Sequence, residues 1–138
     1  MTIRILALSG AVLFGLSTFA QAEMLTFKAD MTPGNESPPA ANSHGSGQAT
    51  VRIDTETKKV TWDIAVKDLT GDPTAAHIHG PAGAGVNAPP LVDMSANIMK
   101  GEGTVTDQQL ADIQAGQTYI NVHTAKYPDG EIRGQLLR

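Results

Sequence analysis

The sequence predicts an all-β protein, a Greek-key-like antiparallel β-sandwich with one short helix, which follows an N-terminal signal peptide. Its 138 residues include 14 glycines and 8 prolines but only 17% charged residues, a composition typical of a turn-rich β fold and not of a disordered chain or a coiled coil. Short segments alternate apolar and polar residues, and turn-forming residues separate them at regular intervals. This pattern favours a sandwich or barrel.

The first 22 residues have the pattern of an export signal. Arg4 supplies a positive charge, residues 5–20 are mostly apolar, and Ala20-Gln21-Ala22 is the small-x-small pattern that signal peptidase recognises. We therefore expect cleavage after Ala22, a single domain at residues 23–138, and a periplasmic or secreted protein. The apolar run is too short and too interrupted for a membrane span, so we expect no membrane anchor after cleavage.

The first half of the domain contains a strand and a hairpin. Residues 24–30 alternate in polarity and predict the first strand, whereas residues 32–47 are rich in Pro, Gly, Ser and Asn and predict an irregular connection. Residues 48–54 and 60–66 alternate on either side of a polar turn, which predicts two antiparallel neighbours. Trp62 is expected in the core.

The second half contains shorter elements. Strands are predicted at residues 75–79 and 91–94, with a loop at residues 80–90 between them. Thr106-Asp107-Gln108-Gln109 matches a capping box and predicts the one helix, which should end before Gly116.

A second hairpin ends the chain. Residues 118–124 and 131–137 flank the turn Tyr127-Pro128-Asp129-Gly130. Tyr119 is expected in the core, and Glu131 and Arg133 are expected to form a same-face pair on an edge strand, of little value to stability when exposed.

Composition excludes several classes of function. The formal net charge is −4 and the basic residues form no cluster, so we expect no nucleic-acid or anionic-lipid partner. The absence of cysteine excludes disulfides, thiolate chemistry and cysteine-based metal sites, which leaves nitrogen and oxygen as metal ligands. No G-x-S-x-G, P-loop or dinucleotide-binding motif is present.

The histidines carry the strongest chemical signal. His77 and His79 are two residues apart on a predicted strand, so both imidazoles project from one face, about 6.6 Å apart along the strand. His123 lies on the polar face of a later strand and would supply a third imidazole if the two strands are neighbours. Three imidazoles suit Cu(II) or Zn(II). His44 is either a fourth ligand or solvated, and the glycine-rich loop after His79 should leave the site open to solvent.

Several motifs resemble the CHRD domain, a family named for its occurrence in chordin. They are Glu36-x-Pro38-Pro39, the Trp62 strand, His77-Ile78-His79-Gly80-Pro81, Tyr119-Ile120-Asn121-Val122-His123-Thr124 and Gly130-Glu131-Ile132-Arg133-Gly134-Gln135-Leu136. The resemblance spans nearly all of residues 23–138. It implies an all-β module that occurs in bacteria as a single exported domain, with a poorly defined biochemical role.

A more distant similarity is to copper,zinc superoxide dismutase, itself a Greek-key β-sandwich. This similarity implies that His77, His79 and His123 match copper ligands and that Arg133 takes the part of an anion-guiding arginine. The loop at residues 80–90 has no histidine or aspartate cluster for zinc, and the disulfide cysteines are missing. These departures put dismutase activity in doubt.

Three functions therefore remain. The leading hypothesis is an exported protein that binds a copper ion, or a zinc ion in its place, through His77, His79 and His123. The second is a dismutase-like redox enzyme at the same site, so enzymatic activity stays open. The third is a metal-free extracytoplasmic interaction module, in which residues 32–47 and 80–90 contact a protein partner of unknown identity.

Overall fold

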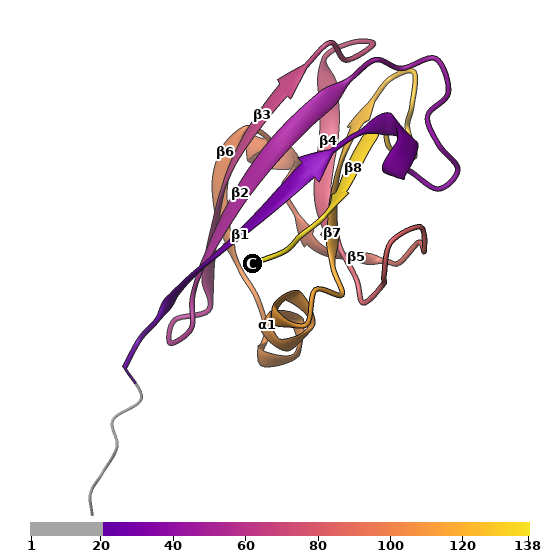
Figure 1. Ribbon diagram of the computed structural model, residues 1–138. Coiled ribbons are helices and arrows are strands. Elements are labelled where there is room, and N and C mark those ends of the chain that lie inside the picture. The colour runs from indigo at the N-terminus through magenta and orange to yellow at the C-terminus, as the bar shows by residue number, and fades with distance from the viewer. Residues whose placement is uncertain (1–20) are drawn as a thin grey trace, which may run out of the picture.

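The computed structural model describes residues 21–138, so nearly all of the predicted signal peptide lies outside the described residues. The described chain forms two antiparallel sheets of four strands each, with one α-helix at one end (Figure 1). The predicted all-β sandwich is therefore confirmed. No helix within residues 21–138 is both long and apolar enough to span a membrane.

The first sheet has the strand order β1-β2-β3-β6. Its members are β1 (Met24–Met31), β2 (Ser46–Asp54), β3 (Lys59–Lys67) and β6 (Lys100–Thr104). The predicted β2–β3 hairpin is present, with Val51 opposite Trp62. In β1 the odd-numbered side chains are buried and the even-numbered ones exposed, as the alternating sequence predicts.

The second sheet has the strand order β5-β4-β7-β8. Its members are β4 (Pro73–His79), β5 (Pro90–Asp93), β7 (Tyr119–Thr124) and β8 (Ile132–Gln135). The chain crosses between sheets after β3, after β5 and again through α1. As a result β3 and β6 are neighbours although β4 and β5 lie between them in sequence, which gives the crossed connectivity expected of a Greek-key-like fold.

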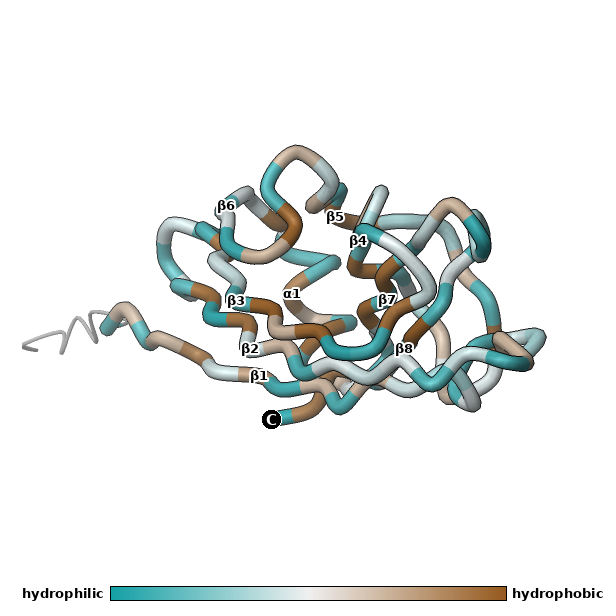
Figure 2. The backbone as a smooth tube through the Cα atoms, turned by 90° about the horizontal axis from the view of Figure 1, so that it is seen from above, coloured by the Kyte–Doolittle hydropathy of each residue, from teal (hydrophilic) through white to brown (hydrophobic). Residues whose placement is uncertain are grey.

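The core fills the space between the two sheets. Hydrophobic stretches occur on β3 of the first sheet and on β4, β5 and β7 of the second (Figure 2). The most completely buried side chains include Phe27, Val51, Ile53, Val60, Ile78, Ile120, Val122 and Ile132. Tyr119, expected in this core, is buried but lies on the other face of its sheet, beside His79.

Strand β6 was not predicted, because its sequence Lys-Gly-Glu-Gly-Thr contains no apolar side chain. The indole ring of Trp62 occupies the space where a side chain of Gly101 would lie, since a Cβ atom there would be 2.5 Å from Trp62 Cζ2. Trp62 Nε1 also donates a hydrogen bond of 2.9 Å to the carbonyl of Asn97. The tryptophan thus supplies apolar packing that β6 itself lacks.

The helix α1 (Asp107–Gln114) begins at the predicted capping box. Thr106 Oγ1 accepts from the backbone N–H of Gln109 at 3.1 Å, and Gln109 Oε1 accepts from the backbone N–H of Thr106 at 2.9 Å. Gly116 follows with a φ of +70°, a conformation that favours glycine at a helix end. Two short 3₁₀ turns, η1 (Pro33–Asn35) and η2 (Ser95–Asn97), accompany α1.

The expected exposed pair of Glu131 and Arg133 is wrong, because both side chains are fully buried and contact different groups. The Glu131 carboxylate accepts hydrogen bonds of 2.6–2.8 Å from Thr124, Ser43 and Thr70. Burial raises the pKa of Glu131, but these hydrogen bonds outweigh it and leave the pKa below its usual value. Glu131 therefore ties two connecting segments to the end of the second sheet.

Candidate metal centre

The pairing of β4 with β7 brings the three predicted histidines together. Ala75 lies opposite His123, and His77 lies opposite Asn121. Because Ile78 and Val122 point into the core, the neighbouring histidines project from the outer face of the second sheet. The same-face prediction for His77 and His79, and the predicted proximity of His123, are both confirmed.

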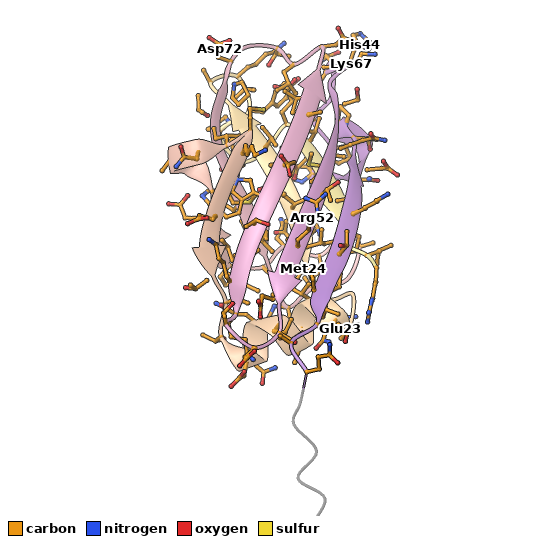
Figure 3. The ribbon with its side chains drawn as sticks, turned by 90° about the vertical axis from the view of Figure 1, so that its left-hand side faces the viewer. Glu23, Met24, His44, Arg52, Lys67 and Asp72 are labelled. Carbon is orange, nitrogen blue, oxygen red and sulfur yellow. The ribbon has the colours of Figure 1, made fainter. Side chains whose placement is uncertain are left out.

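The side-chain nitrogens of these histidines are close enough to share one ion. One ring nitrogen from each lies within 4.8 Å of the other two, and His77 Nδ1 is 3.1 Å from His123 Nε2. His123 is buried, whereas His77 and His79 are partly exposed. His44 is exposed and lies near Lys67, at the top of the view in Figure 3. It does not belong to this group.

Backbone carbonyls fix the protonation of two of the rings. His79 Nδ1 lies 2.8 Å from the carbonyl of Ala88, and His123 Nδ1 lies 2.8 Å from the carbonyl of Pro128. A carbonyl oxygen only accepts hydrogen bonds, so each Nδ1 carries the proton and each Nε2 presents a lone pair. Metal-binding histidines are commonly held in this way through the nitrogen that does not bind the metal.

The third ring faces a carboxylate on its opposite side. His77 Nε2 lies 3.6 Å from Asp93 Oδ1, and the same carboxylate oxygen accepts a hydrogen bond of 2.9 Å from the backbone N–H of Ser95. A proton on Nε2 facing this carboxylate leaves a lone pair on Nδ1, which faces His123. All three rings can therefore direct a lone pair into the same space.

The surroundings favour neutral imidazoles. Burial is the largest effect that lowers the pKa of His77, followed by the nearby His123 and His79 rings. Burial also lowers the pKa of His79, against the opposing effect of the nearby Ala88 carbonyl and Asn121 side chain. Neutral imidazole is the form that binds metal ions, so these rings need not lose a proton first at neutral pH.

Two loops cover the outer face of the second sheet, and both lie on the side away from the first sheet (Figure 1). We call residues 32–45 the first loop and residues 80–89 the second loop. Asn87 of the second loop donates a hydrogen bond of 2.7 Å to the carbonyl of Ser37 in the first. The second loop therefore lies against His79, through the carbonyl of Ala88, while His77 and His79 stay partly exposed, so the site is only in part as open to solvent as expected.

Arg133 donates hydrogen bonds to the second loop from the outer face of the second sheet. Its guanidinium donates to the carbonyl of Val86 at 2.7 Å and to Asn87 Oδ1 at 3.0 Å, and it lies 3.4 Å from the centroid of the Tyr119 ring. The other neighbour of Tyr119 is His79, whose ring stacks on it at 4.8 Å. Arg133 is only 1% exposed, so it braces the site and does not present a surface charge that could guide an anion.

Sequence reasoning missed two further residues at the site. Asn121 is 3% exposed, and its Oδ1 lies 3.0 Å from Nε2 of both His79 and His123. Glu36, in the first loop, is 7% exposed, and one of its carboxylate oxygens has no hydrogen-bond partner. Asn121 could have been found from its alternation with His123, but the irregular sequence around Glu36 gives no signal beyond the family motif.

The Glu36 carboxyl group has a raised pKa. Burial raises its pKa to about 7, although the charge of Arg133 and the neighbouring side chain of Asn121 both oppose this effect. Glu36 and the amide nitrogen of Asn121 both lie close to Gly130, and the amide oxygen of Asn121 contacts two of the histidines. Three imidazole nitrogens with a neighbouring amide form a donor set that fits Cu(II) or Zn(II).

Comparison with known proteins gives one result. A family model described as CHRD domain matches residues 27–136, which include every residue of the site. No curated protein and no solved structure matches the chain.

Proposed function

This chain belongs to the CHRD domain family, and we propose that it is an exported member that binds one copper ion, or a zinc ion in its place, through His77, His79 and His123. The observation that carries this proposal is the convergence of one nitrogen from each ring within 4.8 Å. Carbonyl acceptors on the far side of His79 and His123 support it, since they leave the inward nitrogens free to bind a cation.

The donor chemistry favours copper over zinc. Imidazole nitrogen binds both ions, but Cu(II) forms the more stable complexes with a given set of nitrogen and oxygen ligands. The chain has no cysteine with which to build the thiolate-rich sites that often hold structural zinc. Zinc remains the alternative because three histidines also form zinc sites.

Export is the second part of the proposal and is supported by the N-terminal pattern. The charged start, the apolar segment and the small-x-small motif before Glu23 are the three parts of a signal peptide. The protein would then meet its metal ion in the periplasm or outside the cell.

The two alternatives differ from this proposal in what they require. A dismutase-like reaction requires an anion to reach the metal, and the partial exposure of His77 favours such access. An interaction module requires the two loops to present a surface to a partner. It gains support from the exposed residues 84–87 of the second loop.

A metal titration tests the proposal. The protein, purified without a histidine tag, is titrated with Cu(II) and with Zn(II) beside a His77→Ala/His79→Ala variant and a His44→Ala control. We expect one tight equivalent of Cu(II) in the parent protein and in the control, and its loss in the double variant. Equal, weak binding by all three proteins would contradict the proposal and favour the metal-free interaction module.

Catalysis is then tested on the loaded protein. Superoxide consumption that requires copper and disappears in the double variant would establish the redox alternative at this site. Absence of turnover by a fully loaded protein would leave metal binding as the function.

A further inference from the structure

We propose that the side-chain oxygen of Asn121 is a fourth metal donor at the three-histidine site, and that Glu36 is a positioning residue that keeps this oxygen turned toward the histidines. The inference rests on the metal binding proposed above and assigns two residues that the histidine pattern does not include. The site would then offer three nitrogens and one amide oxygen.

The position of Asn121 is the first argument. It lies on β7 opposite His77 and two residues before His123, so its side chain projects among the imidazoles. Its Oδ1 is 3.0 Å from Nε2 of His79 and 3.0 Å from Nε2 of His123. No other amide side chain in residues 21–138 makes hydrogen-bond-range contacts with two of these rings.

The second argument is that these contacts lack a proton. His79 and His123 each carry a proton on Nδ1, which donates a hydrogen bond to a backbone carbonyl. Both Nε2 atoms therefore have only a lone pair to offer. An amide oxygen also offers only lone pairs. Three such atoms facing one another repel unless a cation lies among them, and a metal ion supplies that charge.

Glu36 supplies the third argument, because it selects one orientation of the amide. The carboxyl group and the Asn121 nitrogen both lie against Gly130, where an added Cβ atom would be 2.3 Å from Glu36 Oε1 and 2.7 Å from Asn121 Nδ2. In its ionised form the carboxyl group accepts the N–H groups of an amide and has nothing to donate to its oxygen. In the structure the nitrogen lies on the Glu36 side and the oxygen faces the histidines.

The opposite orientation makes a different prediction. If the amide nitrogen faced the rings, it would donate one N–H to each Nε2 and would compete with a metal ion for the same lone pairs. Removing the amide would then strengthen metal binding. Under our proposal its removal weakens binding, so the sign of the effect separates the two arrangements.

The experiment compares Asn121→Leu, which keeps the side-chain shape, with Asn121→Asp, which keeps an oxygen donor, and with an exposed control, Asn97→Ala. Each protein is titrated with Cu(II) against a competing chelator, and EPR spectra are recorded. We expect Asn121→Leu to bind about 10- to 100-fold more weakly with an altered spectrum, the size of effect found for groups close to a metal. Asn121→Asp and the control should bind at least as tightly as the parent protein.

Variants of Glu36 test its positioning role. Glu36→Leu removes the carboxyl group beside the amide nitrogen, so its EPR spectrum should shift away from that of the parent protein. Glu36→Gln retains an acceptor oxygen and should restore the parent spectrum. These variants keep Asn121 in place, so they test the proposal even if Asn121→Leu fails to fold.

The outcomes separate this inference from the function on which it rests. If the parent protein binds no stoichiometric copper, the histidine site itself is wrong and the inference falls with it. If the parent protein binds copper but Asn121→Leu binds equally well with an unchanged spectrum, only the inference is wrong. Tighter binding by Asn121→Leu would also overturn it, in favour of a competing amide.

Discussion

The outer faces of the two sheets are both polar in sequence, yet their polar side chains differ in exposure to solvent. On the first sheet Arg52 and Asp63 form an ion pair of 3.1 Å with side chains 46% and 48% exposed, and polar side chains project outward from the strands around Arg52 (Figure 3). On the second sheet Asn121 and Arg133 are 3% and 1% exposed beneath two loops.

This difference shows that the site depends on the two loops that cover the second sheet, and not on the presence of polar residues alone. Exposed ion pairs are screened by water and contribute about 0–1 kcal/mol. Polar groups under the loops have lost their water, so each must find a partner within the protein or a bound ion. The same alternating pattern thus yields a solvated surface on one sheet and a chemically demanding site on the other.

Loss of Arg133 should give the largest effect. Arg133→Met keeps much of the side-chain length but leaves the carbonyl of Val86 and Asn87 Oδ1 without their charged donor. We expect a loss of about 3 kcal/mol in the free energy of unfolding, measured by urea denaturation. The matched change Arg52→Met on the first sheet should cost less than about 1 kcal/mol. Equal losses would show that the loop cover does not distinguish the two faces.

Glu36 should give a pH-dependent effect of intermediate size. Its pKa rises from 4.5 in the unfolded chain to about 7 in the folded protein, so the folded state binds the extra proton between these values. Stability from this group is therefore present at low pH and is lost as the pH rises toward 7. Above pH 7 the ionised carboxylate costs roughly 2–3 kcal/mol.

Glu36→Gln isolates this contribution. The variant should gain stability relative to the parent protein as the pH rises from 4.5 to 8, in metal-free urea denaturation at each pH. The lowered pKa values of His77 and His79 act in the opposite direction, since their contribution is lost as the pH falls below 6.5. Both proteins share these histidines, so the difference between them reports Glu36. A stability difference that did not change with pH would contradict the assignment.

The surface pair should give the smallest effect. A double-mutant cycle with Arg52→Met and Asp63→Asn should measure a coupling free energy below about 0.5 kcal/mol, and added salt should reduce it further. A coupling above about 1 kcal/mol would mean that this face of the first sheet is less solvated than its exposure indicates.

Much of the fold could be predicted because local patterns specify it. Alternation identified the β2–β3 hairpin and β7, turn residues on either side indicated β4, and the capping box identified the start of α1. Strand β6 was missed because its packing comes from Trp62, far away in sequence. The prediction of an exposed Glu131–Arg133 pair was wrong, because alternation indicates which face of a sheet a side chain lies on but not what covers that face.

The site divides in the same way. The sequence by itself determined that His77 and His79 share a face, because the two-residue period of a strand is a local property. Tertiary structure alone decided that His123 joins them, that the carbonyls of Ala88 and Pro128 accept hydrogen bonds from two of the rings, and that Asn121 and Glu36 complete the surroundings. These features depend on strand pairing and loop cover between residues distant in the chain. No local pattern encodes them.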